Sequence, residues 1–252
     1  MNKLAWMGVL WCAASVAAAA DIAATLQWSQ RVELSPRVSG IVREVGVNAG
    51  DRVKKGQALV ALDAAVYEAK VAESRAAVAK FTEEAAETRR DLGRTQELYD
   101  RTVIATSELD QARLRDARAR AQLDGARARL ARDQKDLSDS QLRAPFDAVV
   151  VARLAEPGQS VAVGLQPQPL LVLAKAGEMS ARFRLPADRI ASLKPGQAVT
   201  VKVGRREYPA TLKAPGLEPV AGKDGPVYEV DALFAVKELL RAGTAAVVKL
   251  PE

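Results

Sequence analysis

Two long stretches in the middle of the chain carry apolar residues with the seven-residue period of a coiled coil. Residues 64–100 contain no proline and one glycine, and residues 107–141 are similarly rich in Ala, Leu, Arg and acidic residues. Seven of the ten seam positions in each stretch are apolar, which predicts two helices of about five heptads each. The expected seam contains Val71, Val78, Phe81, Ala85, Leu92, Leu123, Leu130 and Leu137.

An antiparallel register aligns the two seams and places a turn near residues 102–105, so that residues 64–141 form one helical hairpin. The facing pairs are Phe81 with Ala126, Ala85 with Leu123, Ser74 with Asp133, and Leu92 with Asp116. Large residues face small ones in the first two pairs, as close packing requires. The polar pair of Ser74 and Asp133 can form a hydrogen bond. The pairing of Leu92 with Asp116 places a charge opposite an apolar residue, and the sequence does not explain it.

Short runs of β-forming residues, separated by glycines, lie on both sides of the predicted hairpin. Their spacing repeats after 108 residues: Gly50, Val53 and Gly56 match Gly158, Val161 and Gly164, and Leu59 matches Leu170 after a three-residue insertion. Glycine adopts positive φ at little cost, so this spacing predicts β-hairpin units. A generic small β-domain would also contain such units, but the duplication favours two halves of one module.

Segments in which apolar and polar residues alternate continue towards the C-terminus. Residues 179–185, 198–203, 208–212, 227–234 and 245–250 each have the pattern of a short strand. Short strands at these intervals predict a small antiparallel barrel.

Two half-motifs of the biotinyl/lipoyl type, split by an antiparallel helical hairpin, resemble the periplasmic adaptor subunits (membrane fusion proteins, HlyD/RND-type) of tripartite efflux pumps. The resemblance implies a mainly β fold with a long antiparallel α-helical coiled-coil hairpin. Residues 21–63 and 142–174 would form a split lipoyl-like barrel-sandwich hybrid, residues 64–141 the hairpin, and residues 175–252 a small antiparallel β-barrel. A membrane-proximal domain, present in many family members, is expected to be absent or vestigial.

Residues 1–20 have the layout of a secretory signal peptide. A positive start at Lys3 precedes an apolar run and a small-residue tract that ends at Ala20. Cleavage would give a periplasmic protein that can associate with the inner membrane; the alternative is an uncleaved membrane anchor.

Composition limits the chemistry that the chain can perform. The 252 residues include no histidine and one cysteine, which excludes histidine-based acid–base catalysis and the common zinc sites. The formal net charge is +6. Charges of both signs alternate along the two helices, as on a solvated coiled-coil surface, so we expect no nucleic acid partner. Met179 is the sole methionine after residue 20, and we expect neither a soft-metal site, a cofactor nor an enzymatic activity.

A lipoyl-like fold also allows a carrier function. A lipoyl or biotinyl carrier subunit needs a modifiable lysine on the tight turn between its halves, and the helical hairpin replaces that turn here. Lys54 and Lys55, beside Gly50, are better interpreted as solvated turn residues. A free-standing structural coiled coil is a third hypothesis, but it does not explain the flanking half-motifs.

The hairpin tip is the candidate site. The resemblance implies a channel-docking pattern in which Arg94 and Leu98 match the family, while Ala105 stands in place of the family's serine. That serine would cap the second helix, so we expect the cap at Thr106 or Ser107 instead. The partners implied are an inner-membrane transporter, an outer-membrane channel of the TolC type, and further copies of the chain in a ring or funnel. An RND-type transporter is favoured, and an ABC exporter is the alternative.

Overall fold

The computed structural model describes residues 21–164, 166–222 and 225–250, so the expected signal peptide lies outside the described residues. The chain divides into two compact units. One unit, Arg31–Ala176, contains the helical hairpin and is called the lipoyl-like unit. The other combines the described residues up to Gln30 with those from Gly177 onward and is called the barrel unit. No helix in the described ranges is long and apolar enough to cross a membrane.

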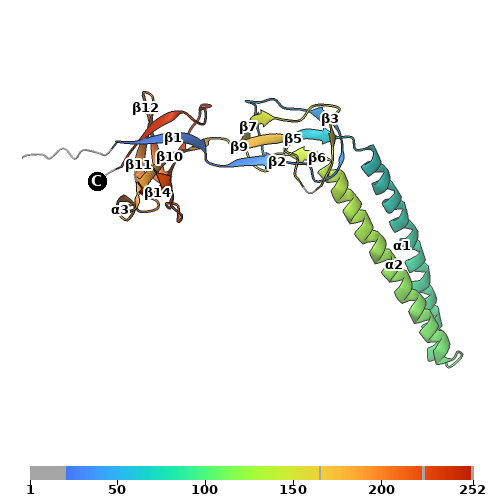
Figure 1. Cartoon of the computed structure of the whole chain (residues 1–252). Helices are drawn as coiled ribbons and strands as arrows, with labels where there is room; N and C mark the ends of the chain where they lie inside the picture. The colour runs from blue at the N-terminus through green and yellow to red at the C-terminus, as the bar shows by residue number, and fades with distance from the viewer. Residues whose placement is uncertain (1–20, 165, 223–224, 251–252) are drawn as a thin grey trace, which may run out of the picture. The chain divides into compact units, whose positions relative to one another are not determined.

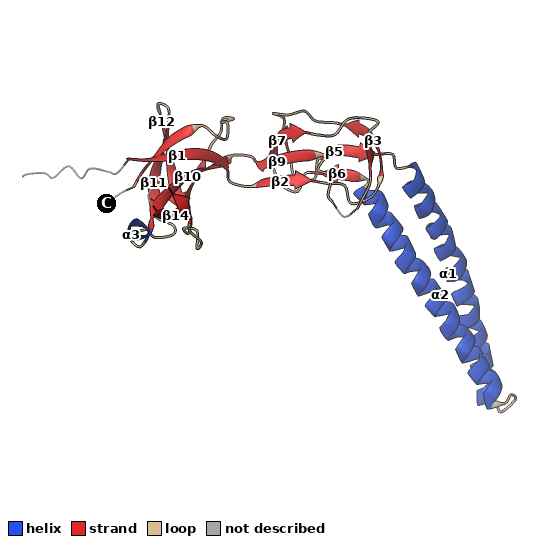
Figure 2. Cartoon of the chain, in the orientation of Figure 1, coloured by secondary structure: helices blue, strands red, loops and turns tan. Residues whose placement is uncertain are grey.

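Two long helices form the hairpin of the lipoyl-like unit (Figure 2). Helix α1 spans Ala65–Asp100 and helix α2 spans Thr106–Asp139, with a five-residue connection between them. At 1.5 Å per residue, each helix is about 50 Å long. Small and apolar residues at heptad spacing bury one stripe of each helix against the other. The buried residues are Val71, Ser74 and Ala85 on α1 and Leu109, Ala112, Asp116, Ala119, Leu123 and Ala126 on α2.

Eight short strands surround the core at the base of the hairpin (Figure 1). They are β2 (Arg31–Leu34), β3 (Gly40–Val45), β4 (Arg52–Val53), β5 (Ala58–Leu62), β6 (Gln141–Arg143), β7 (Ala148–Arg153), β8 (Ser160–Val161) and β9 (Leu171–Lys175). They pair as two four-stranded sheets, in the orders β2-β9-β7-β4 and β6-β5-β3-β8. Each sheet takes two strands from before the hairpin and two from after it, and one apolar core fills the space between them.

The sequence duplication corresponds to a duplicated hydrogen-bond pattern. The Gly50 N–H donates to the Val150 carbonyl, and the equivalent Gly158 N–H donates to the Val42 carbonyl, both at 2.8 Å. Gly50 has a φ of +96° and Gly158 a φ of +87°, a conformation that glycine adopts without steric penalty. Each half therefore completes the other, and the split halves form a single module.

The second unit is an antiparallel barrel. Its strands are β1 (Asp21–Trp28), β10 (Glu178–Pro186), β11 (Ala198–Val203), β12 (Arg206–Leu212), β13 (Val220–Gly222), β14 (Gly225–Ala235) and β15 (Ala245–Lys249), with the short helix α3 at Ala187–Ile190. The described strands follow the order β10-β1-β15-β11-β12-β14-β13, and pairing of β10 with β14 closes a barrel of six strands. Alternate residues point inward to the core, among them Leu26, Phe183 and Val201.

Two expected domain boundaries differ from the structure: residues 175–176 belong to the lipoyl-like unit instead of the barrel, and the larger difference lies near the N-terminus. The sequence predicts residues 21–30 in the lipoyl-like half, but β1 pairs with β10 and β15 and belongs to the barrel unit. The buried side chains of Ala24 and Leu26 join the barrel core. Without β1 the barrel would be open between β10 and β15, which pair with both edges of this strand.

Candidate functional site at the hairpin tip

The expected seam residues line the contact between the two helices to different depths. Val71, Ala85 and Leu123 are buried, and Val78 and Phe81 pack against the cluster of Ala85, Ala119 and Leu123. Leu92, Leu130 and Leu137 are half-buried. The seam therefore makes the hairpin a rigid rod with its tip at one end.

The seam contains one polar pair, Ser74 with Asp133, and one buried carboxylate, Asp116. The Ser74 hydroxyl donates a hydrogen bond to the Asp133 carboxylate, as the register predicted. Asp116 is 4% exposed and lies 2.6 Å from the guanidinium of Arg120 and 3.8 Å from that of Arg89. These two arginines account for the mismatch opposite Leu92, because they bring compensating charge to Asp116 from both helices. Its Oδ1 atom is buried and lacks a hydrogen-bond partner in the described part of the chain.

A tight turn ends α1 at the tip. The N–H of Thr102 donates to the Tyr99 carbonyl at 2.8 Å, and the N–H of Val103 donates to the Leu98 carbonyl at 3.0 Å. This pair of bonds is a Schellman motif, in which the residue at the position of Thr102 must be left-handed. Thr102 has a φ of +61° and is the one non-glycine residue with positive φ among those described. A β-branched residue in this conformation is strained.

The expected cap of α2 is also corrected. Helix α2 begins at Thr106, so neither Thr106 nor Ser107 is its N-cap; the cap is Ala105, with extended backbone at φ −78° and ψ 152°. The Glu108 N–H donates to the Ala105 carbonyl at 3.1 Å. An alanine side chain cannot accept a hydrogen bond, and no side-chain cap bond is present in the described residues at this end. The Thr106 hydroxyl instead donates to the Tyr99 hydroxyl at 3.4 Å and links the two helices.

The tip presents apolar side chains to solvent. Val103 is 65% exposed, Leu98 is 43% exposed and Tyr99 is 36% exposed. All three lie within six consecutive residues of the turn. The sequence predicts Leu98 at the tip but not Val103. The position of Val103 depends on the left-handed backbone of Thr102, and a threonine in the sequence does not predict that conformation.

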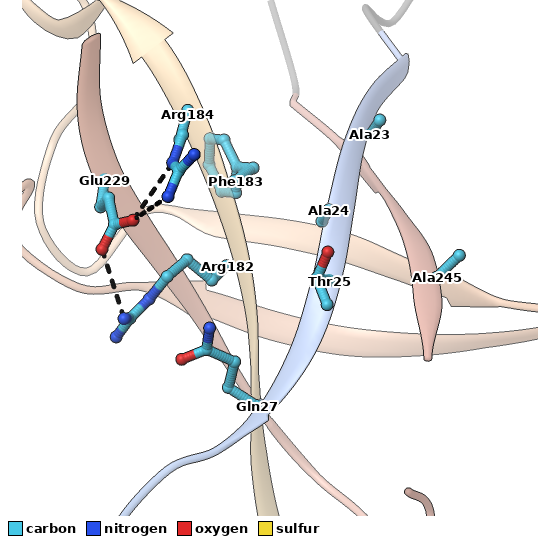
Figure 3. Close-up of a pocket in the computed structure, with 9 residues that line it drawn as sticks. All are labelled: Ala23, Ala24, Thr25, Gln27, Arg182, Phe183, Arg184, Glu229 and Ala245. Carbon is cyan, nitrogen blue, oxygen red and sulfur yellow. Dashed lines mark hydrogen bonds and ion pairs between the residues drawn. The ribbon is translucent and has the colours of Figure 1, made fainter. Parts of the chain in front are cut away.

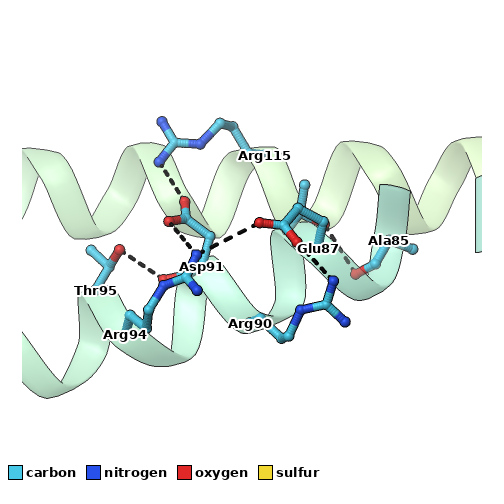
Figure 4. A network of polar contacts seen from close by, with 8 residues as sticks. Ala85, Glu87, Arg90, Asp91, Arg94, Thr95 and Arg115 are labelled. Atoms are coloured by element: carbon cyan, nitrogen blue, oxygen red, sulfur yellow. Dashed lines mark hydrogen bonds and ion pairs between the residues drawn. The ribbon is translucent and has the colours of Figure 1, made fainter. Parts of the chain in front are cut away.

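Arg94 is engaged within its own helix (Figure 4). Its guanidinium lies 3.7 Å from the Glu87 carboxylate and 3.6 Å from that of Asp91. Asp91 also pairs with Arg115 across the hairpin at 3.1 Å. A hydrogen bond and the charge of Arg90, followed by the charge of Arg94, hold the pKa of Glu87 below its ordinary value. Arg94 is thus part of a network of three arginines and two acids, one to two turns below the tip, rather than part of the apolar surface.

Comparison with known proteins decides the family. Residues 30–166 match the family of CzcB-like barrel-sandwich hybrid domains. The chain belongs to the membrane fusion protein family. The pyoverdine export membrane fusion protein PvdR of Pseudomonas putida is 33% identical over 209 residues, which cover 75% of this chain and 53% of PvdR. The chain spans about half the length of the curated relatives that it matches.

Solved structures share the fold of this membrane fusion protein. The membrane fusion protein Spr0693 of Streptococcus pneumoniae has a TM-score of 0.72 at 17% identity, over 91% of this chain and 97% of its own. A MacA–MexA chimera containing the MexA α-hairpin domain of Pseudomonas aeruginosa has a TM-score of 0.68 at 21% identity, over 91% and 79% of the two chains. These likenesses support the split module and its hairpin as a common architecture.

The lysines beside Gly50 have structural partners. The Asp147 carboxylate accepts hydrogen bonds from the Lys55 backbone N–H and the Lys54 ammonium, both at 2.9 Å. The N–H bond first, and the Lys54 bond and charge after it, lower the pKa of Asp147. Lys54 and Lys55 in this membrane fusion protein thus take part in a contact that joins the two halves of the lipoyl-like unit.

The barrel unit has an open hollow of about 550 Å³ on its outer face (Figure 3). Thr25 and Gln27 of β1 border it, and the charged side chains beside it are Arg182, Arg184 and Glu229. The Glu229 carboxylate lies 3.3 Å from Arg182 and 2.8 Å from Arg184. Both arginines are therefore compensated by acids, and no cluster of His, Cys, Asp or Glu suited to a metal occurs in the described ranges.

Proposed function

We propose that this membrane fusion protein is a periplasmic adaptor that links an inner-membrane efflux transporter to an outer-membrane channel for the export of small molecules. It would act by assembly, without catalysing a reaction. The observation that carries this proposal is the hairpin: a seam-packed rod about 50 Å long, rooted in a split lipoyl-like module and ending in exposed apolar side chains.

The relatives support the same activity. PvdR is a pyoverdine export protein, MdtA is a multidrug resistance protein and MacA is a macrolide export protein by their names. We propose an RND-type transporter and a TolC-type channel as partners, because arms of about five heptads are similar to those of RND adaptors. An ABC transporter is the alternative. Several copies would surround the transported molecule in a ring or funnel, and residues 1–20 would direct export to the periplasm.

Crosslinking in cells tests the proposal. Tagged protein, expressed in its native host and crosslinked in intact cells, is expected to co-purify with one inner-membrane transporter and one outer-membrane channel, each identified by mass spectrometry. Recovery of an ABC ATPase would correct the transporter class. Recovery of neither partner, with the protein folded and exported, would contradict the adaptor function.

A matched variant locates the docking site. Leu98→Asp is expected to abolish efflux and channel recovery while transporter recovery and the melting temperature stay unchanged. Leu114→Asp is a suitable control, because Leu114 is 49% exposed on α2, close to the 43% of Leu98. Equal loss in both variants would indicate that charge on the hairpin, rather than the tip itself, disturbs the assembly.

A further inference from the structure

One loop of the lipoyl-like unit contacts the roots of both helices. Residues 35–39 connect β2 to β3, and this loop is called here the strap. The side chain of Val38 packs against the apolar core between the two four-stranded sheets, so the strap is fixed to the strands at the base of the hairpin. Its contacts with α1 and α2 therefore relate the direction of the hairpin to the position of those strands.

The contact with α1 is a hydrogen bond from Tyr67. Its hydroxyl donates to the backbone carbonyl of Ser39, at the end of the strap, over 2.6 Å. This distance lies at the short end of the range for bonds between two oxygen atoms. Burial first, and the carboxylate of Asp136 on α2 second, raise the pKa of Tyr67. The hydroxyl therefore keeps its proton at neutral pH and remains a donor.

The same serine is also bonded to the half of the module that follows the hairpin. The hydroxyl of Ser39 accepts a hydrogen bond of 2.9 Å from the backbone N–H of Val163, which lies just after β8. Ser39 is thus held by the strands and the loops of both halves, independently of the helices. Tyr67 binds an acceptor whose position the base of the hairpin determines.

The contact between the strap and α2 is weaker. The guanidinium of Arg37 lies 3.9 Å from the carboxylate of Asp139 near the end of α2, and the Arg37 side chain is 75% exposed. Asp139 also pairs with Lys135 of its own helix. Exposed ion pairs of this kind contribute little. An open hollow of about 440 Å³ lies beside Arg37 and Asp139 and is also lined by β6, which leaves the root of α2 room to move.

A small movement at Tyr67 is enlarged at the tip. The two roots are joined by the hydrogen bond from the Leu62 N–H to the Ser140 carbonyl, at 2.9 Å, and the hairpin can turn about this point. Tyr67 lies about one helical turn above it, roughly 5 Å, whereas the tip lies about 50 Å away. A displacement of about 1 Å at Tyr67 therefore moves the tip by roughly 10 Å.

We infer that Tyr67 is a positioning residue: its bond to the Ser39 carbonyl sets the direction in which the hairpin leaves the strands of the lipoyl-like unit. Without this bond, only the exposed pair of Arg37 and Asp139 connects the strap to the helices among the contacts described above, and the hairpin tilts towards the hollow beside that pair. This role concerns the chain by itself and does not depend on the proposed function.

Distances between paired spin labels measure the direction of the hairpin. In the full chain carrying Cys12→Ser, the labels are attached through Leu154→Cys at the base and Leu114→Cys on α2, because these residues are 50% and 49% exposed. The pair Ala72→Cys and Leu114→Cys gives a reference distance within the hairpin, since Ala72 is an exposed residue of α1. Pulsed electron paramagnetic resonance measures the distance distribution of each pair.

Removal of one hydroxyl tests the role of Tyr67. Tyr67→Phe is expected to shift or broaden the base-to-hairpin distance by about 5 Å or more and to leave the reference distance unchanged. Tyr99→Phe is the matched control, because it removes a hydroxyl at the other end of α1, where it accepts a bond from Thr106; both distances should keep their wild-type values. Arg37→Ala is expected to change the base-to-hairpin distance less than Tyr67→Phe does.

An unchanged base-to-hairpin distance in Tyr67→Phe would overturn the inference. An equal change in Tyr99→Phe or in the reference pair would overturn it too, because the hydroxyl of Tyr67 would then have no specific effect on direction. A wild-type distribution as broad as that of Tyr67→Phe would show that the bond does not hold the hairpin. The partners of the chain are tested separately, by the crosslinking experiment, and their absence would leave this role of Tyr67 in place.

Discussion

The hydroxyl of Ser74 donates a hydrogen bond to the carboxylate of Asp133 across the seam of the hairpin. These residues lie 59 positions apart in the chain, and a shift of either helix along its partner would separate them. A buried polar pair of this kind can select one register among several that the apolar seam would allow. The reach of the hairpin and the identity of the residues at its tip both depend on that register.

Removal of this pair is expected to destabilise the hairpin. Ser74→Ala leaves the half-buried Asp133 carboxylate without its donor and should lower the free energy of unfolding by about 1–3 kcal/mol. Urea denaturation followed by circular dichroism measures the loss. The double variant Ser74→Ala/Asp133→Ala should lose less than the sum of the single variants, since both remove the same bond. Additive losses would show that the two side chains act independently.

Replacement of a second seam residue, Asp116, is expected to stabilise the protein. Asp116→Leu removes a buried carboxylate that has one unpartnered oxygen in the described structure, and it leaves Arg89 and Arg120 solvated at 66% and 50% exposure. We expect the free energy of unfolding to rise by about 1 kcal/mol. Asp124→Leu is the control, because Asp124 is 74% exposed and should give no comparable gain. A lower melting temperature for Asp116→Leu would mean that its arginine pairs outweigh its burial.

Replacement of Thr102 in the tip turn is also expected to stabilise the protein. Thr102→Gly relieves a left-handed β-branched residue and should stabilise the protein by about 0.5–1 kcal/mol, after the greater freedom of glycine in the unfolded chain is subtracted. Gly50→Ala should have the opposite effect of about 1–2 kcal/mol, because its φ of +96° disfavours any side chain. Thermal unfolding compares the two variants. A destabilising Thr102→Gly would show that the threonine side chain makes a compensating contact.

The contact between the lipoyl-like halves predicts a pH dependence. Because the folded state lowers the pKa of Asp147, its carboxylate stabilises the fold above the ordinary aspartate pKa, and this contribution disappears as the pH falls through the lowered value. Asp147→Asn should therefore be less stable than wild type at pH 7, and the two unfolding free energies should converge as the pH falls below about 4. A difference that stays constant across this pH range would contradict the assigned role of the charge.

Patterns that repeat along the chain predicted much of this architecture, whereas contacts between residues far apart in the sequence could not be predicted. The heptads gave the hairpin with its turn, and the glycine spacing gave two matching halves, because both signals repeat along the chain. Strand β1 was misplaced because its partners, β10 and β15, lie more than 150 positions away and leave no mark beside it. Asp116 was unexplained because Arg89 and Arg120 lie outside the seam positions, and the cap at Ala105 broke the expected rule that a polar side chain begins a helix.

The roots of the two helices are neighbours in one sheet, since α1 follows β5, α2 precedes β6, and Ala61 pairs with Gln141 between those strands. The hairpin is therefore attached to the module at one place, between the neighbouring strands β5 and β6. Deleting one heptad from each arm at facing positions keeps every remaining contact and shortens the rod by about 10 Å. The length of the hairpin can therefore change in discrete steps while the folded base and the distal turn stay the same.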